Sequence, residues 1–184
     1  NSDCKSYADW RDILARKDID AVMISTPDHW HVPMAAAASK AGKDVCCEKP
    51  TLTIAEGRAL IKITRDNKTV FQTSTEDRSI PVYHRMAELV RNGRIGTLKK
   101  IRVTLPSGGL PPEPPKVAPV PKGFDYDMWL GPAPKAPYCT NRCGAQQWRN
   151  IFDYSGGKFT DWGAHMLDTA QWANNTERTG PVEV

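Results

Sequence analysis

The sequence predicts an α/β protein in which a parallel β-sheet covered by helices precedes the beginning of an α+β domain with a mainly antiparallel sheet. Short apolar runs alternate with helical patterns through the first half of the chain, as they do in parallel sheets with crossover helices. Strict alternation of apolar and polar residues then appears over 98–105, which is typical of a strand with one buried face. Hydrophobic residues make up 40% and charged residues 25% of the chain, as expected for a globular protein.

Three apolar runs predict the strands of the parallel sheet. The run over 20–25 is continuous and has polar flanks, so a buried parallel strand fits it best. The runs over 44–47 and 70–73 follow at the spacing of strand–helix–strand units. We expect the three strands to be adjacent and parallel, with their carboxyl ends at one edge. Apolar residues at helical spacing over 7–16 predict a short helix before the first strand.

Two predicted helices connect these strands. The alanine-rich segment 32–40 has a proline near its start, and Gly42 lies just past its end, an arrangement that suits helix termini. Thr53 and Glu56 have the spacing of a capping box, which predicts a helix from there to about residue 67.

The pattern changes after a fourth predicted helix, which starts at Ser79 and stops at Gly93. We place a domain boundary near Thr97, just before the alternating segment. The proline-rich stretch 106–137 suits neither a helix nor an inner strand, and so long a loop is usually functional or disordered. The aromatic residues over 124–129 predict that this part packs.

Composition and cysteine pattern argue against several classes of protein. The net charge is +4, and the basic residues are interspersed, which gives little support for nucleic-acid binding. No apolar run approaches the roughly 20 residues of a membrane-spanning helix. Cys46 and Cys47 lie in a predicted strand and are expected to be core residues. Cys139 and Cys143 could form a disulfide or half of a metal site, although no second pair completes a zinc pattern.

Lys49 lies in Glu48-Lys49-Pro50, directly after the second predicted strand. Ligands of open α/β sheets bind in the crevice outside the carboxyl ends of the strands. Lysine suits proton transfer because burial or neighbouring charges shift its pKa. The same tripeptide is also common in surface loops, so this motif alone leaves both interpretations open.

The segment 156–168 predicts a helix that begins near Thr160, after two glycines. Asp161, His165 and Asp168 are spaced four and three residues apart, so they share one helix face. A carboxylate one turn from a histidine can hold its tautomer and raise its basicity, which is a general-base arrangement. The alternative is a polar helix face with a capping aspartate.

Polar residues also follow the first and third strands. His29 and His31 lie just after the first strand, where they could ligate a metal, contact a cofactor or begin a helix. Arg78 follows the third strand and points to the same crevice, or else is a surface arginine.

Five motifs in order give the chain a family resemblance: TPDHWH, AGKDVCCEKP, NGRIGTLKKI, YDMWLGPAP and FDYSGGKFTDWGAHMLD. Together they resemble the Gfo/Idh/MocA family of nicotinamide-dependent oxidoreductases, over essentially the whole chain. The resemblance implies that residues 1–96 are the carboxyl-terminal part of a dinucleotide-binding Rossmann domain. It implies that residues 97–184 are the amino-terminal part of the substrate-binding α/β domain.

The resemblance also implies roles for single residues, with NAD or NADP as the cofactor and no metal. Lys49, Asp161 and His165 would be catalytic. Arg149 would join these three residues in binding the substrate. The residues implied to contact the cofactor are Thr26, Pro27, His31, Glu48, Lys49, Glu76 and Arg78.

The chain departs from the family pattern because it contains neither a G-x-G-x-x-G turn nor the acidic residue that selects the ribose. It starts without methionine and ends in what resembles the start of a strand. We therefore expect a fragment whose first strands lie upstream and which is inactive by itself. Some relatives carry export signals, so the parent protein could be cytoplasmic or periplasmic in a bacterium.

The expected function is hydride transfer between the nicotinamide and a hydroxyl-bearing carbon of a sugar or polyol. His165 would take the hydroxyl proton, so Lys49 and His165 should converge. The expected partner is this small molecule, with no nucleic acid and no membrane, and the parent is expected to be a homo-oligomer. The alternatives are an NAD-retaining glycosidase on the same scaffold and a non-catalytic sugar-binding or regulatory protein.

Overall fold

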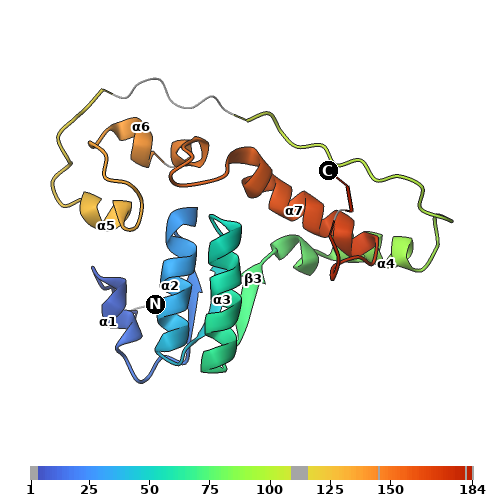
Figure 1. Cartoon of the computed structure of the whole chain (residues 1–184), viewed down its shortest axis with the longest axis horizontal. Coiled ribbons are helices and arrows are strands. Elements are labelled where there is room, and N and C mark those ends of the chain that lie inside the picture. Colours follow the sequence, from blue (N-terminus) through green and yellow to red (C-terminus); the bar gives the residue numbers. More distant parts are fainter. Residues whose placement is uncertain (1–3, 109–115, 145, 181, 184) are drawn as a thin grey trace. The chain divides into compact units, whose positions relative to one another are not determined.

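The computed structural model describes residues 4–108, 116–144, 146–180 and 182–183. The chain forms two compact units (Figure 1). Unit 1 comprises Asn1–Ser74 and Asp127–Pro134, and unit 2 comprises Thr75–Tyr126 and Lys135–Val184. The boundary near Thr97 expected from the sequence refers to family domains, and it stays a prediction.

Unit 1 is built on a three-stranded parallel sheet with the order β1-β2-β3. The strands are β1 (Ala21–Ile24), β2 (Asp44–Glu48) and β3 (Phe71–Ser74). β1 pairs with β2 from Ala21↔Asp44 onward, and β2 pairs with β3 from Val45↔Phe71 onward. The prediction of three adjacent parallel strands is therefore confirmed, and their carboxyl ends lie at one edge of the sheet.

Two helices cover one face of this sheet. The helices α2 (Asp28–Lys40) and α3 (Ile54–Asn67) lie side by side in Figure 1. The core between sheet and helices consists of small and branched side chains: Ile24, Val32, Ala35, Ala38, Val45, Cys47 and Leu60. A shorter helix, α1 (Trp10–Leu14), precedes β1 within the segment predicted to be helical.

The expectation that β1 is buried on both faces is wrong for the described residues. Ile24 is buried beneath the helices, but the neighbouring Met23 points to the other face and is 69% exposed. Cys47 is buried on the helix side, whereas Cys46 is half-buried and lies beside Ser74. No described helix covers that second face.

Helix α2 begins at Asp28, earlier than the predicted start at residue 32. Asp28 suits the first turn because the positive end of a helix favours an anion. Pro33 lies inside the helix, where it lacks an N–H donor for the carbonyl one turn earlier. The motif after β1 is therefore helical, which places His29 and His31 in the first turns of α2.

Helix α3 begins as its capping box predicts. The Oγ1 of Thr53 accepts a hydrogen bond from the Glu56 N–H at 3.1 Å, and the Thr53 N–H donates to Glu56 Oε2 at 3.0 Å. These two bonds satisfy two main-chain donors that a helix start otherwise leaves unpaired.

The segment Asp127–Pro134 packs against the first turn of α2, within unit 1. The Trp30 indole N–H donates to the carbonyls of Met128 and Trp129, at 3.0 and 3.2 Å. Gly131 has a φ of +49° and lies directly against the Trp30 ring. This close approach leaves no room for a side chain at Gly131.

Unit 2 is helical in its described part. Its longest helices are α4 (Pro81–Arg91) and α7 (Gly157–Ala173). The 3₁₀ turn η1 (Glu76–Ser79) precedes α4, while α6 (Thr140–Cys143) and η2 (Gln147–Asn150) precede α7. The helix expected from Ser79 therefore begins at Pro81, and the helix expected from Thr160 begins at Gly157.

The strand predicted over 98–105 is wrong, because no described residue of unit 2 is in a strand. A strand is defined by its partner, and this segment has no hydrogen-bonded partner among the described residues. Apolar and polar side chains of this segment, Ile101 and Val103 as well as Lys100 and Arg102, line a cavity of about 370 Å³ together with side chains of α4 and α7.

The aromatic residues over 124–129 pack, as predicted. The helix α5 (Tyr126–Leu130) lies where the chain passes from unit 2 to unit 1. The Tyr126 and Tyr138 rings pack edge to face with their centroids 5.2 Å apart, and the centroids of the Phe124 and Tyr138 rings are 6.0 Å apart. Part of the surrounding proline-rich stretch, 109–115, lies outside the described residues.

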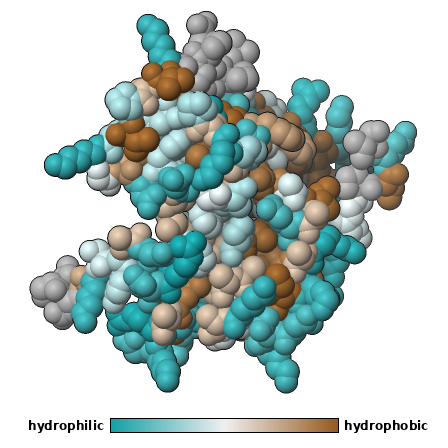
Figure 2. Space-filling model, turned by 60° about the vertical axis from the view of Figure 1, so that its left-hand side comes forward, coloured by the Kyte–Doolittle hydropathy of each residue, from teal (hydrophilic) through white to brown (hydrophobic). Residues whose placement is uncertain are grey.

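On the face drawn in Figure 2, hydrophilic side chains cover much of the surface, and hydrophobic residues appear between them in small groups. None of the described helices combines the length and the apolar composition that crossing a membrane requires.

Candidate active site

In unit 1, the residues predicted to bind a cofactor follow the ends of β1 and β2. Thr26 and Pro27 come after β1, and Glu48 and Lys49 lie at the end of β2. Because β1 and β2 are adjacent and parallel, these residues share one edge of the sheet. The peptide bond from Lys49 to Pro50 is cis.

His31 is 2% exposed and links the ends of these two strands. Its Nε2 lies 2.8 Å from the Thr26 carbonyl oxygen, and its Nδ1 lies 2.8 Å from the Pro50 carbonyl oxygen. Both ring nitrogens therefore contact the main chain. The predicted contact of His31 with a cofactor stays a prediction.

The structure assigns His29 a packing role in unit 1. Its Nε2 lies 2.9 Å from the Trp129 carbonyl oxygen, and its ring packs against the Trp129 ring at 5.4 Å. Burial lowers the pKa of His29, and the nearby His31 adds to this effect. No group of three or more His, Cys, Asp or Glu side chains in the described chain could hold a metal.

The cysteines in the described part are free thiols. Burial, with the charge of Glu48 as a smaller contribution, raises the pKa of Cys47 to about 12, so this thiol stays neutral in the core. Cys139 and Cys143 are not joined by a disulfide. Burial also raises the pKa of Cys143, to about 11.

In unit 2, Asp161 lies in α7 between two cations. Its carboxylate oxygens are 3.5 Å from Arg149 Nε and 3.6 Å from Lys158 Nζ, and its side chain is 14% exposed. Arg149 also stacks over the Trp148 ring at 4.4 Å. The sequence implied Arg149 through the resemblance, whereas Lys158 was missed although it lies at the i,i+3 spacing that pairs charges on a helix.

His165 lies one turn after Asp161 in α7, and its ring packs edge to face on Trp162 at 6.4 Å. Its Nδ1 lies 3.6 Å from Glu76 Oε2, slightly beyond hydrogen-bonding distance. The carboxylate beside this Nδ1 thus comes from Glu76 of η1. The sequence had assigned that supporting role to Asp161 and had placed Glu76 at the cofactor.

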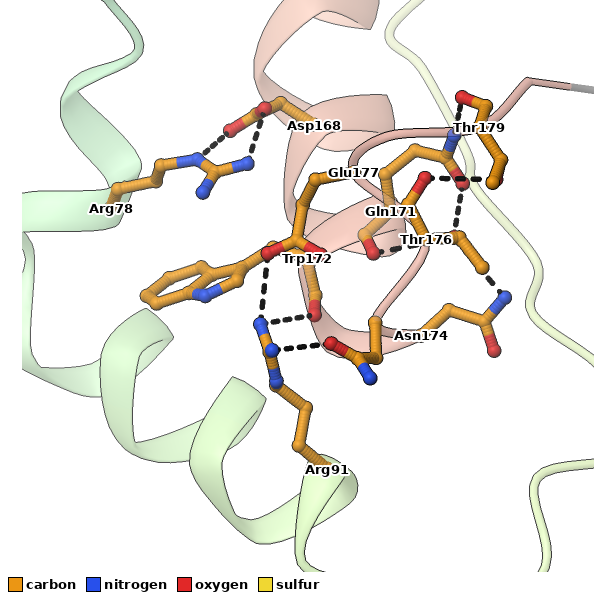
Figure 3. Close-up of polar contacts among 10 residues, drawn as sticks. Arg78, Arg91, Asp168, Gln171, Trp172, Asn174, Thr176, Glu177 and Thr179 are labelled. Carbon is orange, nitrogen blue, oxygen red and sulfur yellow. Dashed lines mark hydrogen bonds and ion pairs between the residues drawn. The ribbon is translucent and has the colours of Figure 1, made fainter.

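Arg78 bridges η1 and α7, as Figure 3 shows. Its Nε and a terminal nitrogen donate to the two Asp168 carboxylate oxygens at 2.6 and 2.8 Å. Its guanidinium also lies over the Trp172 ring at 5.2 Å. The hydrogen bonds that Arg78 donates to Asp168 raise the pKa of Arg78. Arg78 is therefore a partly exposed arginine held in an ion pair, and a cofactor contact by Arg78 stays a prediction.

The residues at the edge of the unit 1 sheet fit a bound dinucleotide. Thr26 Oγ1 is buried and has no hydrogen-bond partner in the described part of the chain. A buried hydroxyl of this kind calls for a partner, and ligands of parallel sheets bind outside the carboxyl ends of the strands. The sequence contains no G-x-G-x-x-G turn, so no residue is assigned to the pyrophosphate.

Two family models match the chain. One, described as an oxidoreductase family with an NAD-binding Rossmann fold, matches residues 1–75. The other, described as the carboxyl-terminal alpha/beta domain of the oxidoreductase family, matches residues 112–184. Between them they account for most of the chain.

Individual proteins agree with these matches. The chain is 35% identical over 100 residues to a levoglucosan dehydrogenase from Pseudarthrobacter phenanthrenivorans, which covers 54% of this chain and 26% of that protein. It is 34% identical over 101 residues to an inositol 2-dehydrogenase from Rhizobium meliloti, and this match covers 54% of this chain and 31% of that protein. The matched part thus spans about a quarter to a third of these relatives.

A solved structure extends the likeness to both units. The oxidoreductase domain protein from Kribbella flavida is similar over 91% of this chain and 38% of its own, with 26% identity and a TM-score of 0.60. With its parallel sheet and its two matched domains, the chain belongs to the Gfo/Idh/MocA family of oxidoreductases, with an NAD-binding Rossmann-type fold.

Proposed function

We propose that the full-length protein is an NAD- or NADP-dependent oxidoreductase that oxidises or reduces a hydroxyl-bearing carbon of a sugar or polyol. The relatives named above act on levoglucosan and on inositol, as their names state. The observation that supports the proposal within this chain is His165, which lies on α7 with a carboxylate beside its Nδ1.

In this proposal His165 is the proton acceptor. A carboxylate near Nδ1 favours a proton on that nitrogen, which leaves Nε2 free to take the proton of a substrate hydroxyl. The separation of 3.6 Å from Glu76 is loose, and such contacts commonly tighten when substrate binds.

Asp161, Arg149 and Lys158 would bind the hydroxyl groups of the substrate. A carboxylate held between two cations stays ionised and accepts hydrogen bonds, while the cations donate them. A sugar or polyol presents both donors and acceptors, so this group suits it.

Lys49 would polarise the reacting oxygen through its ammonium group. Thr26, Pro27, Glu48, Lys49 and Arg78 remain the proposed cofactor contacts, whereas for His31 and Glu76 we favour the partners described above, which are two main-chain carbonyls and the His165 imidazole. The nicotinamide supplies the hydride acceptor or donor when it is bound. The approach of Lys49 to His165 stays a prediction, as do the homo-oligomer and the absence of nucleic-acid and membrane partners.

The test is a substrate panel on the full-length protein. Sugars, anhydrosugars and inositols are each mixed with NAD⁺ or NADP⁺, and reduced cofactor is followed by absorbance while the oxidised product is identified by mass spectrometry. Stoichiometric release of reduced cofactor and oxidised product supports the proposal.

Two other results would contradict it. Hydrolysis of a glycoside without net cofactor reduction would indicate the NAD-retaining glycosidase. Saturable sugar binding without any turnover would indicate a binding or regulatory protein.

A further inference from the structure

The end of β2 is fixed to the end of β1 by a single buried side chain. His31 Nε2 is 2.8 Å from the carbonyl oxygen of Thr26, which follows β1, and His31 Nδ1 is 2.8 Å from the carbonyl oxygen of Pro50. Pro50 is the residue directly after Lys49. The imidazole therefore spans the main chain on both sides of the sheet edge where Lys49 lies.

The two contacts depend on which nitrogens of the His31 ring carry a proton, and burial shields them from water. Carbonyl oxygens only accept hydrogen bonds, so each bond requires a ring N–H. A neutral ring supplies one such donor, and the doubly protonated ring supplies both. His31 is 2% exposed, so water does not compete freely for either nitrogen, and an unmade bond would leave a buried carbonyl unsatisfied.

The helix that carries His31 is also fixed to the sheet. The Sγ of Cys47 in β2 lies 3.9 Å from the His31 carbonyl oxygen. The next turn of α2 contributes Val32 and Ala35 to the core beneath β1 and β2. The ring is thus held by a rigid element, and the loop that follows Lys49 is held by the ring.

We propose that His31 is a positioning residue for Lys49. By bonding the Pro50 carbonyl, His31 fixes the main chain at Lys49 relative to the end of β1, and so fixes where the lysine ammonium is presented. This inference rests on the proposed function, because it concerns a residue that takes part in turnover. It differs from a cofactor contact, since His31 acts through main-chain carbonyl groups.

The test uses His31→Gln and His31→Asn in the full-length protein, with His84→Gln as the matched control. His84 is exposed on α4, and its ring meets the Trp172 ring edge to face. The amide of glutamine or asparagine carries both of its N–H donors on one nitrogen, whereas the two carbonyls are contacted by different nitrogens of the His31 ring, so neither substitution is expected to reproduce both contacts. Three quantities are measured: kcat, the Kd of the cofactor, and the rate at which acetic anhydride labels Lys49, read by mass spectrometry.

Positioning by His31 predicts a kcat lower by about 10- to 100-fold, since small misplacements at a reacting centre cost this much. The Kd of the cofactor should change by less than about twofold, because in this inference His31 does not contact the cofactor directly. The labelling rate of Lys49 should change in both His31 variants and stay at the wild-type value in His84→Gln. Normal kcat and normal Lys49 labelling would overturn the inference, and so would a weakened cofactor Kd with unchanged labelling.

Lys49→Met separates this inference from the proposed function. If Lys49→Met keeps full turnover, the catalytic role of Lys49 fails whatever His31 does. If the His31 variants do not fold, NMR of the wild-type protein provides the test. The His31 Nδ1–H should be protected from exchange with water and coupled to the Pro50 carbonyl carbon; coupling to the Thr26 carbonyl alone, or an Nδ1 proton that exchanges freely, would overturn the inference.

Discussion

Substitution of Gly131 by alanine should detach the Asp127–Pro134 segment from α2. A Cβ atom built on Gly131 would lie 2.0 Å from Trp30 Cζ2 and 2.3 Å from Trp30 Cε2. Atoms do not approach this closely, so either the indole or the segment must move. Trp30 cannot move without losing its hydrogen bonds to the Met128 and Trp129 carbonyls.

The expected loss of stability has two parts. Gly131 has a φ of +49°, and an alanine in that region costs about 1–2 kcal/mol in the backbone. Overpacking against a buried ring costs about 1–3 kcal/mol more. The free energy of unfolding should therefore fall by about 2–5 kcal/mol.

Gly123→Ala is the matched control, because Gly123 has a φ of +82° but no atom within 4 Å of a built Cβ. Gly123→Ala should lower the free energy of unfolding by the backbone contribution alone, about 1–2 kcal/mol. Urea unfolding followed by tryptophan fluorescence measures both variants. Equal losses in the two variants would refute the contact with Trp30. A Trp30→Leu background, in which Gly131→Ala should cost no more than the control, tests the same pair by a double-mutant cycle.

Three further predictions concern single side chains. Arg78→Ala should lower the free energy of unfolding by about 1–2 kcal/mol, because the partly exposed pair with Asp168 is bidentate; a thermal melt unchanged from the wild type would contradict this. His29 has a lowered pKa in the folded chain, so the unfolded chain binds its proton more readily. The contribution of the neutral His29 ring to the free energy of unfolding is fully present above the ordinary pKa of 6.5 and is lost as the pH falls below it. The stability difference between wild type and His29→Gln should therefore shrink from pH 7.5 to 5.5, and a constant difference would argue against the burial of a neutral ring. Glu76→Gln should lower kcat by about tenfold or more without weakening cofactor binding, because His165 loses its neighbouring carboxylate; a weaker cofactor Kd with normal kcat would return Glu76 to the cofactor.

The parallel sheet could be predicted because its cause is local. Each strand is a short apolar run with polar flanks, and strand and helix patterns alternate, so pairing and direction follow from general rules. The capping box at Thr53 and Glu56 was equally local. The start of α2 at Asp28 was missed because a proline is common in the first turn of a helix, whereas Pro33 lies inside α2.

The region over 98–105 shows where a sequence pattern is insufficient. Alternating apolar residues indicate one buried face, but in the structure Lys100 and Arg102 line the same cavity as Ile101. The alternation does not supply the partner that makes an extended segment a strand.

The sequence indicated which candidate site residues share a helix, but not which side chains they contact. Asp161 and His165 share a face of α7, which follows from their spacing alone. The partners from η1, Glu76 to His165 and Arg78 to Asp168, join segments far apart in the sequence. Nothing in the local pattern of η1 indicates which helix it meets. Only the fold of unit 2 brings the two segments together.

The central claim is that His165 moves the substrate proton in a nicotinamide-dependent oxidation. The most direct test is His165→Ala in the full-length protein, assayed with the best substrate of the panel, with cofactor binding measured by fluorescence titration. We predict that kcat falls by roughly a hundredfold or more while the cofactor Kd stays nearly unchanged. Full turnover by this variant would contradict the role of His165.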